Sequence, residues 1–500
     1  MPDKATFLQK AAADFRYRFV ARLEQNIRSG ESWSYARICN EVSGEAGGPE
    51  GMEAAKALAA GVSRLDDVIM YEVEDRALAL FAASFGRHSR VPACRRGAIR
   101  IAKFCCAESH GLRRQTNQGL SLLVNGFSKW PDASKWPDAT GCREATVAIA
   151  GEVARCRDRL SDIPQGLANL VNGFSKWPEA TGCREATVAI AGEVCCRAVR
   201  TARLFDFAPQ ALANLVNGFS KWPDALGCRE AAVAIAGEVP SRLSGFNPQA
   251  LANLVNGFSK WPDAERCCEA AVAIAGRVPS RLSGFDPQEL ANLVNGFSKW
   301  PDAERCCEAA VAIGGEVPSR LANFKPLELA NLVNGFSKWP DVEGCREAAV
   351  AIAGEVPSRL SGFDPQELAN LVNGFSKWPD AERCCEAAVA IAGEVPSRLS
   401  GFDPQARANL VNGFSKWPDV AACREAAVAI AGEVPSRLSG FNPQQLANLV
   451  NGFSKWPDAE RCREAAVAIA GEVPSRLSGF DPQALANLVN GFSKWPDAER

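Results

Sequence analysis

The sequence predicts an all-α fold, a right-handed α-α superhelix (solenoid) of stacked helix pairs. First, the word SKWP recurs along the chain, and from Trp222 onward its tryptophans lie 39 residues apart. Second, each repeat holds two stretches whose apolar residues recur every three or four positions, as in amphipathic helices. Third, one apolar stripe cannot form a core alone, so successive pairs must stack and bury a continuous seam.

A period of 39 residues lies close to that of HEAT and armadillo repeats and exceeds that of tetratricopeptide repeats. Earlier intervals are longer, and the extra residues fall in a duplication at 128–139 and after the GEV segment at 195–207. Insertions confined to two points of a unit mark its loops.

The pattern extends upstream of the first SKWP word. Residues 78–85 resemble the LANLVNGF segment, and 53–59 resemble EAAVAIA. We therefore expect an N-terminal helical region at 1–49, degenerate leading repeats at 50–118 and the SKWP array at 119–500. Because the array stops inside the opening of a second helix, we expect a truncated product. Whether residues 1–49 include the native N-terminus stays open from the sequence.

The unit that begins at Asp286 shows clear helix signals. Asp286 suits the N-cap, a proline follows it, and Glu289 can complete a capping box. Pro301 predicts that this first helix ends at Trp300. Its expected apolar stripe consists of Leu290, Leu293, Val294, Phe297 and Trp300.

The second helix of the unit follows directly. Asp302 is expected to cap it and Pro318 to end it, with a short connector up to Phe324. Its expected inward stripe consists of Cys306, Ala310, Ile313 and Val317.

The first helix also carries a polar face opposite its apolar stripe. At about 100° per residue, two asparagines, a glutamine and a lysine fall together in each unit. These candidate partner-binding residues are Gln288, Asn292, Asn295, Lys299, Gln366, Asn370, Asn373, Lys377, Gln444, Asn448, Asn451 and Lys455. Amides donate and accept hydrogen bonds, so rows of them suit an extended peptide backbone or nucleobase edges. They could equally bond one another and hold the stack in register, or form neutral surface.

The tryptophans fall in phase with the core, so we expect them to be packing residues, with base stacking as the alternative. Charge favours a protein partner over nucleic acid. The unit 286–324 holds six acidic and three basic residues, the reverse of what phosphate binding demands. The row of SKWP lysines could still supply a local basic stripe.

Other function classes find little support in the sequence. No segment approaches the length of a membrane span, and the start lacks the apolar core of a signal peptide. The 19 cysteines recur on the second helix, often as adjacent pairs, which indicates buried thiols in a reducing compartment. Without a CxxC pair, and with only His88 and His110, we expect no metal site. No catalytic constellation is present, so we expect neither an enzyme nor a cofactor.

The words FSKWPDA and PQxLANLVNG, with the Cys-x-Glu-Ala-Ala helix, resemble the SKWP family of type III secreted effectors from a plant-pathogenic bacterium. The resemblance covers residues 50–500. It implies HEAT/armadillo-like repeats, delivery into the host plant cell and a role in virulence. We accordingly expect a monomeric scaffold that binds unidentified host protein in the reducing cytoplasm or nucleus, without membrane attachment.

A second resemblance offers a different partner. Residues 287–292 are similar to the opening of the first helix in octotricopeptide repeats, which are helical RNA-binding units of organelles. Single-stranded RNA binding is therefore the alternative function. The positions with which that family reads bases barely vary here, apart from Glu289 against Ala250 or Gln445. Little sequence information could be read by such a surface.

Overall fold

The computed structural model describes residues 49–64, 67, 70, 75–107, 112–113, 115–131, 135–156, 164–200 and 204–495. The region expected at 1–49 thus lies almost wholly outside them. Every regular element in the described part is helical, which confirms the all-α prediction. The chain forms two compact units, unit 1 (Met1–Cys267) and unit 2 (Cys268–Arg500).

Each repeat contributes an A helix before its SKWP word and a B helix after it. The A helices are α5 (Asp75–Arg87), α8 (Asn117–Phe127), α10 (Pro164–Phe174), α12 (Pro209–Phe219), α14 (Pro248–Phe258), α16 (Pro287–Phe297), α18 (Pro326–Phe336), α20 (Pro365–Phe375), α22 (Pro404–Phe414), α24 (Pro443–Phe453) and α26 (Pro482–Phe492). The B helices are α3 (Pro49–Val62), α6 (Pro92–Ala107), α9 (Thr140–Arg155), α11 (Thr181–Arg200), α13 (Leu226–Arg242), α15 (Glu265–Ala275), α17 (Glu304–Arg320), α19 (Glu343–Arg359), α21 (Glu382–Arg398), α23 (Ala421–Glu433) and α25 (Glu460–Arg476).

Short 3₁₀ turns fill most connectors from a B helix to the next A helix, and one precedes α9. They are η1 (Pro137–Ala139), η3 (Leu243–Gly245), η4 (Pro279–Gly284), η5 (Leu321–Asn323), η6 (Leu360–Gly362), η7 (Leu399–Gly401), η8 (Pro435–Gly440) and η9 (Leu477–Gly479).

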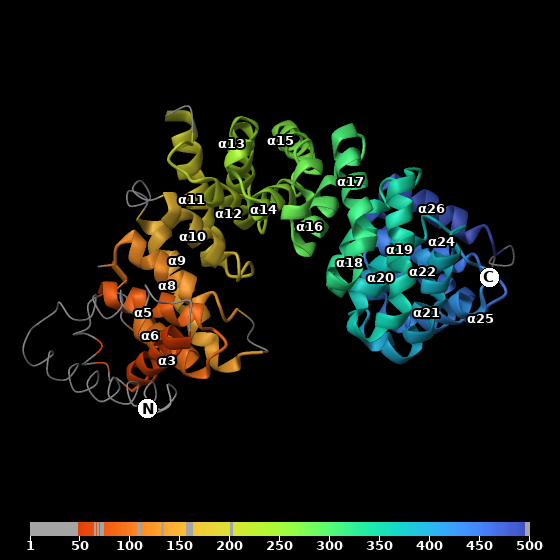
Figure 1. Ribbon diagram of the computed structural model, residues 1–500. Coiled ribbons are helices and arrows are strands. Elements are labelled where there is room, and N and C mark those ends of the chain that lie inside the picture. The colour runs from red at the N-terminus through yellow and green to blue at the C-terminus, as the bar shows by residue number, and fades with distance from the viewer. Residues whose placement is uncertain are drawn as a thin grey trace, which may run out of the picture. The chain divides into compact units, whose positions relative to one another are not determined.

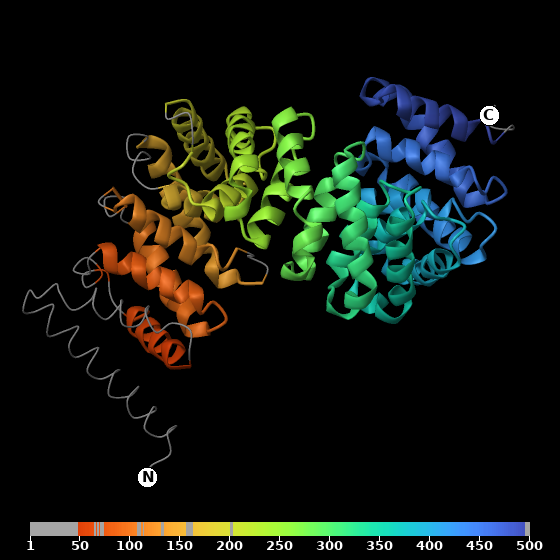
Figure 2. The same cartoon turned by 45° about the horizontal axis from the view of Figure 1, so that its top comes forward.

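Within each unit, helices of the same kind pack side by side in chain order. In unit 1, α8, α10, α12 and α14 form the A layer, and α6, α9, α11 and α13 form the B layer. In unit 2, the A layer runs from α16 to α26 and the B layer from α17 to α25 (Figures 1 and 2). Upstream, α3 packs on α6 and α5 packs on α8, so the earliest described helices follow the same order. This stacking of helix pairs confirms the solenoid prediction.

The start of the A helix is as predicted, and its end is not. Asp286 Oδ1 accepts from the Glu289 backbone N–H at 2.8 Å, and Glu289 Oε2 accepts from the Asp286 N–H at 2.8 Å, so the capping box is present. The helix ends at Phe297, three residues before the predicted Trp300. Ser298 ends it earlier because its Oγ donates to the Asn295 carbonyl at 2.7 Å.

Both predicted ends of the B helix were wrong. Ala303 is the N-cap of α17, with no side-chain cap from Asp302. The helix also runs through Pro318 to Arg320. Pro318 is tolerated because it sits in the last turn, where Val317 is buried and Ser319 Oγ donates to the Glu316 carbonyl at 2.9 Å. In two other repeats the helix changes to a 3₁₀ turn at that proline, at Pro279 and Pro435.

The predicted core stripes are confirmed. Leu290, Phe297 and Ile313 are 0% exposed, and Trp300 is 7% exposed. Burying one such Leu, Ile or Phe side chain contributes about 1.5–3 kcal/mol. The other repeats supply the same set, but in α22 the buried Arg407 stands at the position of Leu290 and its Nη2 donates to the Leu399 carbonyl at 3.1 Å.

Candidate functional site

The predicted polar face lies on the open side of the A helices. In α16, Gln288 and Lys299 are exposed, while Asn292 and Asn295 are partly buried. In α20 and α24 both asparagines are again partly buried and the lysine is exposed, while Gln444 is exposed and Gln366 is partly buried. The structure therefore brings each predicted set together on one surface. Its two asparagine rows, however, have different bonding partners.

The first asparagine of each set bonds within its own helix in most repeats. Gln366 Nε2 donates to Asn370 Oδ1 at 3.1 Å, one helical turn later. The same bond recurs between Gln165 and Asn169, Gln210 and Asn214, Gln405 and Asn409, Gln444 and Asn448, and Gln483 and Asn487. This bond occupies the Asn370 oxygen, and no described residue accepts from its Nδ2.

The second asparagine bonds between repeats throughout unit 2. These pairs are Asn334 Nδ2 to Asn295 Oδ1 at 3.3 Å, Asn412 to Asn373 at 3.5 Å, and Asn490 to Asn451 at 3.3 Å. The predicted alternative of a structural ladder thus holds for this row of unit 2. The ladder consists of separate pairs, and it leaves the first asparagine row out.

Unit 1 shows no such pairing. The side-chain amides of its second asparagines make no hydrogen bond to any described residue. These residues are Asn125, Asn172, Asn217 and Asn256. All four are partly buried on the A-helix face. Their donors and acceptors are thus available to another molecule.

The SKWP lysines of unit 1 form an exposed basic row beside these amides. Lys129, Lys176, Lys221 and Lys260 are all exposed, and none forms an ion pair with a described acidic residue. Partial desolvation, with Lys129 nearby, lowers the pKa of Lys176. Desolvation also lowers the pKa of Lys221, with Lys260 and Lys176 adding to the effect. Adjacent lysines are therefore close enough to repel one another, and an anion placed along the row would relieve that repulsion.

The other SKWP residues hold neighbouring repeats together. The ten repeat tryptophans from Trp130 to Trp495, leaving out the duplicated Trp136, are between 2% and 7% exposed, which confirms their packing role. Trp378 Nε1 donates to the Pro340 carbonyl of the preceding repeat at 2.8 Å. The same bond joins Trp222 to Pro178, Trp261 to Pro223, Trp339 to Pro301, Trp417 to Pro379, and Trp456 to Pro418. The duplicated word is different: Trp136 is partly exposed, and the Arg95 guanidinium lies 4.3 Å from its ring centroid.

Two contacts between repeats were not predicted from the sequence. The glycine of NGF faces the valine of the preceding A helix, so that a Cβ on Gly374 would lie 2.5 Å from Val333 Cγ1. The aspartate of WPD, expected as a helix cap, instead accepts from an arginine of the preceding B helix. Arg229 Nη2 lies 2.7 Å from Asp263 Oδ2. The second contact exists only where arginine follows the repeat cysteine, and that alternation was visible in the sequence.

The repeat cysteines are core residues. All described cysteines are free thiols, and the first cysteine of each B helix from α9 onward is buried. Burial raises the pKa of Cys306 and of Cys384 to about 12, so neither is a thiolate at neutral pH. The described residues contain no group of three or more His, Cys, Asp and Glu able to hold a metal ion. No helix among them is long and apolar enough to cross a bilayer.

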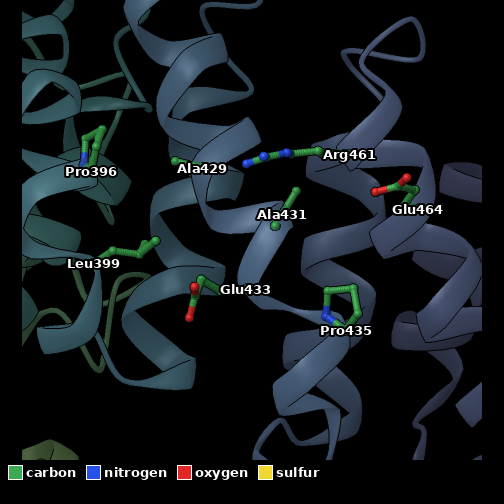
Figure 3. Close-up of a pocket in the computed structure, with 9 residues that line it drawn as sticks. Pro396, Leu399, Ala429, Ala431, Glu433, Pro435, Arg461 and Glu464 are labelled. Atoms are coloured by element: carbon green, nitrogen blue, oxygen red, sulfur yellow. The ribbon is translucent and has the colours of Figure 1, made fainter.

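A pocket of about 350 Å³ opens among the B helices of unit 2 (Figure 3). Arg461 extends from α25 toward Ala429 on α23, while Glu433 and Glu464 add negative charge to the lining. The Arg461 guanidinium covers Gly432, and arginines cover the equivalent glycines at Gly237, Gly276 and Gly354. The pocket wall is therefore part of the ordinary packing between repeats.

The stacked helix pairs and the polar side of the A helices together define a helical-repeat protein with an amide-rich A-helix surface. The sequence matches no protein family and no curated protein. Solved structures do match. One is the pentatricopeptide repeat protein PPR10 in complex with an 18-nucleotide RNA element, 14% identical, with 97% of this chain and 89% of that chain covered and a TM-score of 0.23.

Proposed function

We propose that this chain is a non-enzymatic scaffold that binds a protein partner through the A-helix face. The observation that carries the proposal is the row of unbonded asparagine amides in unit 1 beside the row of exposed lysines. A stacked helical repeat presents such rows as one extended surface. Side-chain amides can both donate to and accept from a peptide backbone.

Protein is favoured over RNA by the position of the aromatic side chains. Single-stranded RNA is held largely by stacking of its bases on exposed aromatic rings. Here the repeat tryptophans are buried, and their indole N–H groups are mostly bonded to proline carbonyls. The excess of acidic residues in the repeat at 286–324 also opposes a long phosphate backbone along that part of the array.

The experiment is affinity capture from plant-cell extract, with and without nuclease. The tagged full chain is compared with a variant carrying Asn172→Ala, Asn217→Ala and Asn256→Ala. We expect a nuclease-resistant protein partner that the variant fails to retain, with unchanged helical circular dichroism. Equal capture by both chains would show that the A-helix face does not bind the partner, and nuclease-sensitive capture would indicate RNA instead.

We further propose that binding takes place inside the host plant cell after type III secretion, and that it promotes virulence. The SKWP resemblance motivates this proposal, and the free thiols support a reducing compartment. A reporter fused to the chain should enter plant cells from bacteria with a working type III system. Entry from a secretion-deficient strain would contradict the proposal.

A further inference from the structure

Neighbouring repeats are joined by one of two polar bonds. In unit 1 the three junctions of α8/α10, α10/α12 and α12/α14 carry the arginine–acid ion pairs Arg143–Glu179, Arg184–Asp224 and Arg229–Asp263. None of these junctions has an asparagine pair. The ion-pair distances are 3.3, 2.7 and 2.7 Å.

The junctions of unit 2 alternate between the two bonds. The α16/α18 and α20/α22 junctions have asparagine pairs, and cysteine replaces the arginine there, as Cys307 and Cys385. The α18/α20 and α22/α24 junctions have the ion pairs Arg346–Asp380 and Arg424–Asp458, without an asparagine pair. At α24/α26 the asparagines pair, and Asp497, which would face Arg463, lies outside the described residues. No described junction has both bonds.

The glycine–valine contact gives a physical reason for this exclusion. At every one of these junctions a Cβ on the glycine would lie between 2.1 and 2.7 Å from the valine Cγ1 of the preceding repeat. Two A helices in such close contact at one point cannot approach further there, but they can tilt about it. A tilt about this point that closed the arginine–acid distance on the B side would open the amide distance on the A-helix face. The amide pairs, at 3.3–3.5 Å, are long enough for a small tilt to break them.

At the described junctions, formation of the arginine–acid ion pair therefore goes with unbonded asparagine amides. Where the arginine forms its ion pair the asparagine amides are unbonded, and unit 1 has such ion pairs at three consecutive junctions. Its four unbonded amides therefore form an uninterrupted row beside four exposed lysines. In unit 2, by contrast, the second asparagine of each A helix, from Asn295 to Asn490, is already bonded to its counterpart in a neighbouring repeat.

The spacing of the rows selects the shape of the ligand. Packed helices lie about 8–10 Å apart, and a peptide in the polyproline II conformation rises about 3.1 Å per residue with three residues per turn. One repeat therefore corresponds to about three peptide residues, whose every third side chain lies on the same face. A carboxylate at every third position would meet each lysine in turn, while the backbone between them faces the amides.

We infer that unit 1 binds an extended acidic peptide across α8, α10, α12 and α14. Its carboxylates pair with Lys129, Lys176, Lys221 and Lys260, and its backbone bonds to the amides of Asn172, Asn217 and Asn256. This inference rests on the proposed function and narrows it to one unit and one peptide chemistry. Arg143, Arg184 and Arg229 act as positioning residues that keep the amides open.

The test uses fluorescence anisotropy with the full chain and two labelled peptides of equal composition. One has aspartate at every third position among alanine and serine, and the other has its aspartates contiguous. We expect the spaced peptide to bind about ten-fold more tightly, because only it matches the lysine row. Equal affinity for the two peptides, or binding of neither, would overturn the inference, while the capture experiment tests the proposed function separately.

Matched substitutions locate the site. Lys176→Glu with Lys221→Glu should weaken binding of the spaced peptide by about ten-fold or more, because each change replaces attraction by repulsion. The same changes in unit 2, Lys377→Glu with Lys416→Glu, should have little effect. An equal loss from the unit 2 variant would place the site elsewhere. Tight binding of labelled oligouridylate without peptide binding would show that the lysine row binds RNA, and it would overturn the inference of a peptide ligand.

The positioning role has its own readout. Arg184→Cys should weaken peptide binding about three-fold, because the freed junction lets Asn172 and Asn217 pair with each other, and one such bond is worth a few-fold in affinity. Arg184→Lys should retain binding, and Arg346→Cys in unit 2 should leave it unchanged. Unaltered affinity of a folded Arg184→Cys variant would show that the arginine does not control the amides.

Discussion

Units 1 and 2 are built from nearly the same repeat, yet their A-helix faces differ. Both use the glycine–valine contact and the indole–carbonyl bond at their junctions. Unit 1 has ion pairs at consecutive junctions and leaves its asparagines unbonded, whereas unit 2 alternates ion pairs with asparagine pairs. The difference follows the ion pairs: every described junction with an arginine–acid pair lacks an asparagine pair. Repetition of sequence is therefore no guarantee of a uniform binding surface.

The largest expected effect comes from the contact that the two units share. A Cβ on Gly218 or Gly413 would lie 2.3 or 2.6 Å from the facing valine Cγ1, with valine backbone atoms behind it. Either alanine substitution should lower the free energy of unfolding by about 1–3 kcal/mol, because overpacking separates the helices. Thermal melts followed by circular dichroism would measure the loss.

The control for this prediction is Gly393→Ala in α21, where nothing lies within 4 Å of the added Cβ. That change should stabilise the chain by about 0.5–1 kcal/mol through helix propensity. A stabilising Gly413→Ala would refute the glycine–valine pivot. A loss confined to one unit would mean that the units do not share it.

A smaller effect should distinguish the units directly. Asn373→Ala removes the bond from Asn412 and should cost about 0.5–1.5 kcal/mol relative to Asn217→Ala, whose amide has no described partner. Because both changes replace asparagine by alanine on an A helix, the difference in helix propensity cancels. Equal melting temperatures for the two variants would show that the pairs in unit 2 contribute nothing to stability.

The sequence predicted the parts of the molecule that depend on local patterns. Apolar spacing placed both helices and their buried stripes, and Asp286 with Glu289 predicted the capping box. The helix ends were misplaced because the serine bond near Phe297 and the tolerance of Pro318 depend on neighbouring turns. The polar face was placed correctly as a surface.

Bonding within that face could not be predicted from one repeat. The asparagine pairs and the ion pairs join residues 34 to 40 positions apart, so they depend on how one repeat is tilted on the next. Helical periodicity gives the face on which a residue lies, but it carries no information on that tilt. The alternation of Cys-Arg and Cys-Cys was the available signal, and its meaning required both partners to be seen together.

The smallest effect concerns the ion pairs. Hydrogen bonding from Arg424 lowers the pKa of Asp458 from its ordinary value of 3.8. A carboxyl group with a lowered native pKa contributes stability above its unfolded pKa, and that contribution is lost as the pH falls through the native value. Arg424→Cys should therefore melt slightly below the unsubstituted chain at pH 6, and the two should converge on acidification below pH 3.8. Because both side chains are largely exposed, high salt should also remove the difference.

The reverse change, Cys307→Arg, should create a pair with Asp341 and break the bond between Asn295 and Asn334, giving unit 2 a junction of the unit 1 kind. If that variant keeps its asparagine pair, as judged by an unchanged penalty for Asn334→Ala, the two bonds are independent.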